Sequence, residues 1–164
     1  MFPEKAKEFA IEKHGEQKYG DLPYVEHLQN VVDVLLQYGH GGDDVLIASA
    51  WLHDVLEDTD ANKKDIYNQF GRSTSEIVWA LTGEGNNRSE KFLSVVPKLQ
   101  ANKKALMIKL ADRIANVSSS LSARRYSLYE MYQKEFPEFK KHLYRETDQP
   151  EVLMLWEKLF SLFE

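Results

Sequence analysis

Residues 51–59, WLHDVLEDT, constrain this chain more than any other stretch because they place charged groups at the end of an apolar run. Residues 45–52 are almost wholly apolar, and the GGDD sequence before them is typical of a helix start. A helix that is apolar on nearly every side lies in a protein core. Four ionisable side chains stand at its end: His53, Asp54, Glu57 and Asp58. Burying them costs roughly several kcal/mol unless the charges pair or hold a metal ion, so the stretch predicts a divalent cation.

Composition limits the kinds of site that are available. With 164 residues, 43% of them hydrophobic, the chain is long enough for one domain with a sizeable core. The formal net charge of −5 argues against a general nucleic-acid-binding surface. Because there is no cysteine, disulfides and thiolate zinc sites are excluded, and any metal must be held by His, Asp and Glu.

The sequence shows no targeting or membrane signal. Its first residues, MFPEKAKE, contain no apolar signal-peptide core, and no run approaches the ~20 apolar residues that span a bilayer. We therefore expect a cytoplasmic protein that does not bind membranes. No repeat, low-complexity tract or long linker divides the chain, which predicts a single domain over residues 1–164.

Hydrophobic spacing indicates helices joined by short polar loops, without useful period-two alternation, so the predicted fold class is all-α. The expected helices cover residues 3–13, 24–38, 45–58, 60–69, a segment ending near 82, a segment from 89, 102–118 and 151–163. Phe70-Gly71 is expected to end one of these helices, and Thr74 or Ser75 to cap the next. The amphipathic tail either closes the core or forms a homodimer contact, and we favour closure.

Two further residues complete a set of metal ligands. His27 lies near the start of the helix that follows Pro23, and Asp112 lies among apolar neighbours within KLADRIAN. Two imidazoles and two carboxylates form a mixed site that suits Mn²⁺, Fe²⁺ or Mg²⁺ better than structural zinc. On a continuous helix His53 and Asp54 point about 100° apart, so other helices must complete the shell. Four protein ligands leave positions on a six-coordinate ion for water and a phosphate oxygen.

Each of these residues also has a simpler interpretation. A single buried His is often a satisfied core group, and Asp112 can pair with Lys109 or Arg113. Glu57 and Asp58 can be solvated residues at a helix end. His27, the His53-Asp54 pair and Asp112 each lie on an apolar helix. Their occurrence together favours metal binding over these separate explanations.

Four sequence elements occur in one order: Tyr24-x-x-His27, Leu52-His53-Asp54-Val55-x-Glu57-Asp58-Thr59, Phe70-Gly71 and Lys109-Leu-Ala-Asp112-Arg113-x-x-Asn116. Together they resemble the HD-domain metal phosphohydrolases, and within them the hydrolase domain of the Rel/SpoT alarmone enzymes and their small single-domain relatives. The resemblance covers about residues 6–119, with C-terminal helices following in 120–164. It implies a single HD-domain helical bundle.

The resemblance also implies a reaction. One Mn²⁺ would be held by the four ligands named above, and Glu57 and Asp58 would position and activate the attacking water. The substrate would be guanosine tetra- or pentaphosphate, which loses its 3′-pyrophosphate. Carboxylates beside the ligands can accept a proton from water whose pKa the ion has lowered. Asn116 matches the position that contacts the nucleotide sugar.

The sequence departs from the family where the nucleotide is recognised. The family carries an Arg-Lys pair before the Pro-Tyr element, whereas residues 14–21 contain only Lys18, beside a Tyr19 that could stack on a base. Ala115 and Ser119 stand where the family usually has His and Thr. Phosphate binding needs cations near the metal, and four candidates are available: Lys18, Arg88, Lys91 and Lys109.

Three hypotheses follow, in order of preference. The first is a metal-dependent phosphohydrolase, most specifically a guanosine 3′,5′-bis(diphosphate) 3′-pyrophosphohydrolase that uses a Mn²⁺-activated water. The second keeps this chemistry but changes the nucleotide, as a phosphomonoesterase or pyrophosphatase, because the Arg-Lys pair is missing. The third is a binding module that holds metal and nucleotide without turnover, and the intact Glu57 and Asp58 argue against it.

Overall fold

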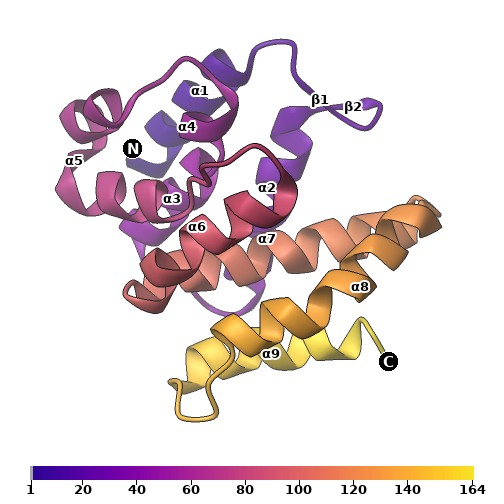
Figure 1. The fold of residues 1–164 in the computed structure, drawn as a ribbon. Coiled ribbons are helices and arrows are strands. Elements are labelled where there is room, and N and C mark those ends of the chain that lie inside the picture. Colours follow the sequence, from indigo (N-terminus) through magenta and orange to yellow (C-terminus); the bar gives the residue numbers. More distant parts are fainter. Residues whose placement is uncertain (1) are drawn as a thin grey trace.

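The computed structural model describes residues 2–164, and its regular structure is almost entirely helical, which confirms the all-α prediction (Figure 1). The helices are α1 (Phe2–His14), α2 (Tyr24–Gln37), α3 (Asp44–Leu52), α4 (Val55–Asp58), α5 (Lys63–Ala80), α6 (Arg88–Gln100), α7 (Lys103–Ser122), α8 (Tyr126–Leu143) and α9 (Pro150–Ser161). A small antiparallel hairpin, β1 (Lys18–Tyr19) and β2 (Leu22–Pro23), joins α1 to α2.

The long helix α7 lies at the centre of the bundle. It contacts α2, α3 and α5 on one side and α6, α8 and α9 on the other, so it separates the N-terminal helices from the C-terminal pair (Figure 1). Leu110, Ala111 and Val117 on α7 are fully buried. Such complete burial explains why this helix is apolar around most of its circumference.

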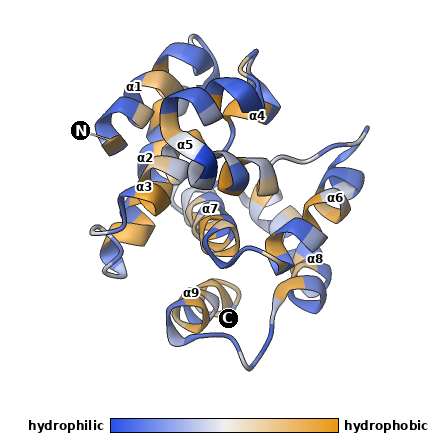
Figure 2. Cartoon of the chain, turned by 90° about the vertical axis from the view of Figure 1, so that its left-hand side faces the viewer, coloured by the Kyte–Doolittle hydropathy of each residue, from blue (hydrophilic) through white to orange (hydrophobic). Residues whose placement is uncertain are grey.

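Helix α3 is the core helix that the apolar run predicts. Residues 46–52 are all buried, and Figure 2 shows the helix as apolar along its length. Asp43 caps its N-terminus by accepting a hydrogen bond from the backbone N–H of Leu46 at 3.0 Å. The predicted start of this helix is therefore confirmed.

The predicted cap that follows Phe70-Gly71 was wrong. Asn62 caps α5 in a capping box with Asp65, and this helix runs past Gly71, whose φ of 87° introduces a kink. Thr74 and Ser75 therefore lie inside α5, where both are buried, and neither caps a new helix. The sequence signal at Phe70-Gly71 marked a real break, but a single left-handed glycine accommodates it and helical structure resumes at once.

The C-terminal helix α9 closes the core. Val152, Leu155, Trp156 and Leu159 are buried, and α9 packs against α7. The amphipathic pattern of the tail thus reflects intramolecular packing, as favoured from the sequence. Among residues 2–164, no helix is both long and apolar enough to cross a membrane.

Candidate metal centre

Four side chains from three parts of the chain converge beside α7. His27 comes from the first turn of α2, His53 and Asp54 from the break between α3 and α4, and Asp112 from the middle of α7. One potential ligand atom from each residue lies within 4.8 Å of all the others. The four predicted metal ligands are therefore brought together in space.

The break after α3 makes this convergence work. Helix α3 ends at Leu52, His53 remains in the α region, and Asp54 has φ −105° and ψ 0° before α4 begins. The prediction of one continuous helix over residues 45–58 was wrong. On such a helix adjacent side chains diverge by about 100°. The turn instead lets His53 Nε2 approach Asp54 Oδ2 to 3.0 Å.

The donor atoms of this cluster fit a bound cation. The Nδ1 of His53 lies 2.8 Å from the Ala50 carbonyl oxygen, which can only accept, so Nδ1 carries the proton and Nε2 presents its lone pair to the cluster. That buried Nε2 makes no hydrogen bond to any described residue, although it lies 3.4 Å from Asp112 Oδ1. Electron-rich atoms that face one another need a shared positive charge.

The pKa values of the clustered groups also indicate that this site favours a positive charge. Burial alone would lower the pKa of His53, but the negative charges of Asp54 and Asp112 outweigh it and hold the pKa well above its usual value. Burial raises the pKa of Asp112, but the nearby imidazoles of His27 and His53 outweigh this effect and hold it well below its usual value. The distance from His27 Nε2 to Asp112 Oδ1 is 2.9 Å.

Two tyrosines fix the orientation of the cluster. The hydroxyl of Tyr24 donates to Asp54 Oδ2 at 2.6 Å, and burial together with the Asp54 charge raises the pKa of Tyr24. Tyr19 stacks on His27 with ring centroids 4.6 Å apart, and its hydroxyl donates to Asn116 Oδ1 at 2.6 Å. Tyr19 therefore covers one face of the His27 ring, and that face of Tyr19 is not open for a base. The position of Tyr24 within the Tyr-x-x-His element was a signal for its role that the sequence interpretation did not use.

Asn116 is part of the same network. Its Nδ2 donates to Asp112 Oδ1 at 3.2 Å, while its Oδ1 accepts from Tyr19. One amide thus links the hairpin to a predicted metal ligand. A substrate that reached Asn116 would have to exchange with the Tyr19 hydroxyl.

Glu57 and Asp58 lie on α4, at the side of the cluster, and each is held by one neutral donor. Glu57 Oε1 accepts from the backbone N–H of Gly83 at 2.7 Å. Asp58 Oδ2 accepts from Gln17 Nε2 at 3.1 Å, and Gln17 Oε1 lies 2.7 Å from Nδ1 of the buried His14. Partial burial raises the pKa of both carboxyls. The sequence interpretation assigned no role in the site to Gln17 or His14.

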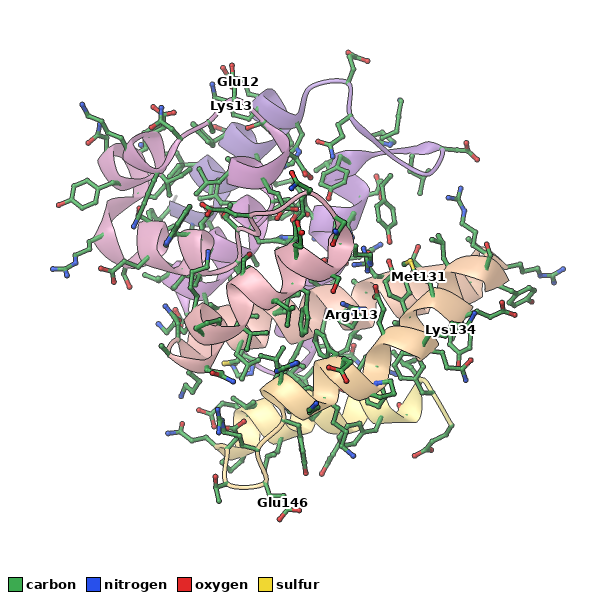
Figure 3. The ribbon with its side chains drawn as sticks, viewed as in Figure 1. Glu12, Lys13, Arg113, Met131, Lys134 and Glu146 are labelled. Carbon is green, nitrogen blue, oxygen red and sulfur yellow. The ribbon has the colours of Figure 1, made fainter. Side chains whose placement is uncertain are left out.

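Three of the four predicted phosphate-binding cations line one cavity. The cavity has a volume of about 420 Å³ and lies between α6, α7, α8 and the turn at Gly83. Arg88, Lys91 and Lys109 line it, together with Glu57 and a fourth cation, Arg113, which the sequence interpretation considered only as a partner for Asp112. Figure 3 shows Arg113 where α7 meets α8.

Lys18 lies elsewhere. It is exposed on β1, next to Tyr19, whose side chain faces the cluster, and successive side chains of a strand point to opposite sides. A different cation approaches the hairpin: the guanidinium of Arg125 lies against Gly20 so closely that a Cβ there would come within 2.5 Å of it. Arg125 also lies 3.8 Å from Asp21.

Comparisons with known proteins agree with this geometry. The model of the HD domain family matches residues 6–136. A guanosine-3′,5′-bis(diphosphate) 3′-pyrophosphohydrolase of Aquifex aeolicus is 35% identical over 123 residues, which are 71% of this chain and 17% of that protein. The enzyme of the same name, MESH1, from Drosophila melanogaster is 32% identical over 115 residues, 67% of this chain and 64% of that protein. The chain thus spans less than two thirds of these relatives.

Solved structures support the same fold. A metazoan ortholog of SpoT that hydrolyses ppGpp superimposes with a TM-score of 0.72 at 24% identity, covering 99% of this chain and 93% of that one. A Listeria monocytogenes protein gives a TM-score of 0.67 at 19% identity, covering 87% and 98%. Since the family model matches most of the sequence, this chain belongs to the HD-domain family.

Proposed function

We propose that the protein is a metal-dependent phosphohydrolase that removes the 3′-pyrophosphate of guanosine 3′,5′-bis(diphosphate). The observation that carries this proposal is the cluster of two buried imidazoles and two partly buried carboxylates, with Glu57 and Asp58 beside it on α4. Relatives named for this reaction are 32–35% identical to the chain. We further propose that residues 1–164 form one HD domain in the cytoplasm, with a small nucleotide as its partner and no role in nucleic-acid binding.

His27, His53, Asp54 and Asp112 would hold the ion. A divalent cation at this site lowers the pKa of water and polarises a phosphoryl oxygen. We assign Mn²⁺, with Fe²⁺ and Mg²⁺ as alternatives, because a mixed set of nitrogen and oxygen donors without thiolates suits these ions. Tyr24 keeps the Asp54 carboxylate turned towards the cluster through its 2.6 Å hydrogen bond.

Glu57 and Asp58 would orient the attacking water and accept its proton. Each carboxylate keeps one oxygen bonded to a neutral donor, which leaves its other oxygen able to accept a proton. In the reaction the water oxygen bonds to the phosphorus next to the ribose 3′-oxygen, and the bond between that phosphorus and the 3′-oxygen breaks. The 3′-oxygen takes up a proton, and pyrophosphate leaves.

Recognition of the nucleotide would use residues on both sides of the cluster. We propose that Asn116 contacts the sugar. Phosphate would be contacted by three cations of the cavity: Arg88, Lys91 and Lys109. Lys18 on the hairpin would contact a part of the nucleotide farther from the cluster. A different nucleotide is the second candidate substrate. It is favoured by the hairpin, where Tyr19 covers His27 and no Arg-Lys pair is present.

The test is release of phosphate and pyrophosphate by the Mn²⁺-loaded protein from a panel of nucleotides. The panel contains guanosine 3′-pyrophosphates, nucleoside 3′- and 2′-phosphates and ordinary nucleoside triphosphates, with Asp54→Ala as the blank. Pyrophosphate from the guanosine 3′-pyrophosphates alone supports the proposal. Phosphate from another nucleotide retains the chemistry and rejects the substrate. No release from the metal-loaded protein rejects the enzyme and leaves a binding module.

A further inference from the structure

The lining of the cavity between α6, α7 and α8 contains a carboxylate that is paired with two of its arginines. Glu135 of α8 accepts hydrogen bonds from Nε and Nη2 of Arg88, the latter at 3.0 Å. It also accepts one from Nη1 of Arg113 at 2.8 Å. A carboxylate that bridges two guanidinium groups uses the same planar, paired hydrogen bonds that arginines make to phosphate. Glu135 therefore holds the two arginines in a geometry that a phosphate group could share.

Aromatic rings fix these arginines further. The guanidinium of Arg113 lies 5.1 Å from the centroid of the Tyr132 ring and 4.7 Å from that of Phe139, and Arg88 lies 5.5 Å from Tyr132. The side chain of Arg113 is only 9% exposed. A stacked and mostly buried guanidinium group such as that of Arg113 loses little further freedom when it binds an anion, whereas the Arg88 side chain is 54% exposed. The cavity is a prepared site rather than a set of loose surface charges.

The cavity also opens beside the reaction centre. Glu57, a proposed acceptor of the water proton, is part of its lining. Lys109, another lining residue, places its Nζ 3.9 Å from Asp112 Oδ2, a proposed metal ligand. An anion that extends away from the cluster on this side would pass Lys109 and reach Lys91 and the two arginines.

The lining of the cavity contains cations that are not paired with Glu135 and are therefore able to bind such an anion. Lys91 and Lys109 are not bonded to Glu135, and Glu138, the other acid of α8 in the lining, is paired with Lys141 and His142 on its own helix. Glu135 is thus the anion that satisfies the arginines, and it is half-buried and reaches them from the opposite wall. A phosphate would compete with this one carboxylate for its partners.

We propose that this cavity is the subsite for the outer phosphate of a pyrophosphoryl group, and that Glu135 occupies its arginines until the phosphate enters. The inference rests on the proposed function for the position of the inner phosphate at the metal cluster. Lys91 and Lys109 meet the incoming anion first, and Arg88, the more exposed of the two arginines, then exchanges Glu135 for phosphate oxygen. Arg113 remains with Glu135 and keeps α8 attached to α7.

Binding of inorganic pyrophosphate to the full chain tests the proposal directly. We would use isothermal titration calorimetry after removal of divalent metal, because pyrophosphate itself chelates such ions. We expect one saturable site that weakens about tenfold in Lys91→Ala and in Arg88→Ala, since each removes one unit charge from the lining of the cavity. The matched control is Lys64→Ala, which removes an exposed lysine from α5 and should leave binding unchanged.

Glu135→Gln tests the competing carboxylate. The amide keeps an acceptor for Arg113 but loses the negative charge, so we expect pyrophosphate to bind about tenfold more tightly. Lys91→Ala leaves every ion pair of the cavity intact and remains informative if Glu135→Gln unfolds. The proposal is overturned if wild-type protein binds no pyrophosphate, or if binding is the same in Lys91→Ala and in wild type.

The two proposals fail in different ways. If pyrophosphate binds as expected but no guanosine 3′-pyrophosphate is hydrolysed, the subsite stands and the proposed function falls. If hydrolysis occurs but Lys91→Ala and Arg88→Ala change neither pyrophosphate binding nor the KM, the function stands and the subsite falls.

Discussion

Gly83→Ala should displace the carboxylate of Glu57 without changing metal binding. A Cβ at residue 83 would lie 2.9 Å from Glu57 Oε1, 2.9 Å from the Cβ of Lys91 and 3.1 Å from the Lys91 carbonyl oxygen. Two of these three neighbours belong to the ordered first turn of α6, so they yield little. The carboxylate of Glu57 must therefore move, and the turn at residue 83 must shift as well to relieve the contacts with Lys91.

That movement has a calculable consequence. It strains or breaks the 2.7 Å hydrogen bond from the Gly83 N–H to Glu57, and a hydrogen bond to a charged group is worth about 1.5–3 kcal/mol. Misplacing a catalytic group by about 1 Å costs on the order of 100-fold in rate. We expect kcat to fall by about 10- to 100-fold, while Mn²⁺ binding stays unchanged because none of the four clustered ligands touches residue 83.

The assay is steady-state pyrophosphate release together with Mn²⁺ titration of the same preparation. Gly42→Ala is the matched control, since a Cβ there meets nothing within 4 Å. Wild-type kcat in a folded Gly83→Ala protein would refute the reasoning, because it would show that the placement of Glu57 does not limit the reaction.

Three further outcomes are expected. Tyr24→Phe removes the hydrogen bond to Asp54, so Mn²⁺ affinity should fall about 10- to 100-fold in a metal titration, and unchanged affinity would deny Tyr24 an orienting role. Gln17→Leu releases Asp58, so kcat should fall several-fold at constant Mn²⁺ affinity; equal turnover would show that Asp58 needs no such support. Burial raises the pKa of Glu135, but its two arginine partners outweigh this and hold it below 4.5. Its stabilising effect is therefore fully present above about pH 4.5 and is lost as the pH falls through the lowered pKa. Urea unfolding should show Glu135→Gln less stable than wild type at pH 7 and equal to it in acid, and a difference independent of pH would contradict this.

Much of the site could be predicted because its chemistry is local. An apolar helix that ends in His53 and Asp54 requires a partner for buried charge wherever it lies, and the same holds for Asp112 inside α7. The all-α fold followed from spacing for the same reason, since the apolar faces of α2 and α9 repeat at the helical period.

The cationic side of the site could be predicted only in part. Arg88, Lys91 and Lys109 were named from sequence as candidate cations for phosphate, and all three line one cavity in the structure. Glu135 lies more than 40 residues from Arg88, and nothing in the local sequence of α8 reveals that it bridges that residue to Arg113. The place of Lys18 outside this cavity has another cause, because one register step in a hairpin decides which side a residue faces.

The sequence alone determined the helical class, the buried helix α3 and the identities of the four clustered donors, because side-chain polarity and hydrophobic spacing act over a few residues. Tertiary structure decided how those donors meet. The break after Leu52 turns His53 and Asp54 to one side, the hairpin lays Tyr19 on His27, and α8 brings Glu135 to the cavity. Each of these depends on contacts between distant segments, whose geometry is set by the packing of the whole bundle and not by any one stretch of chain.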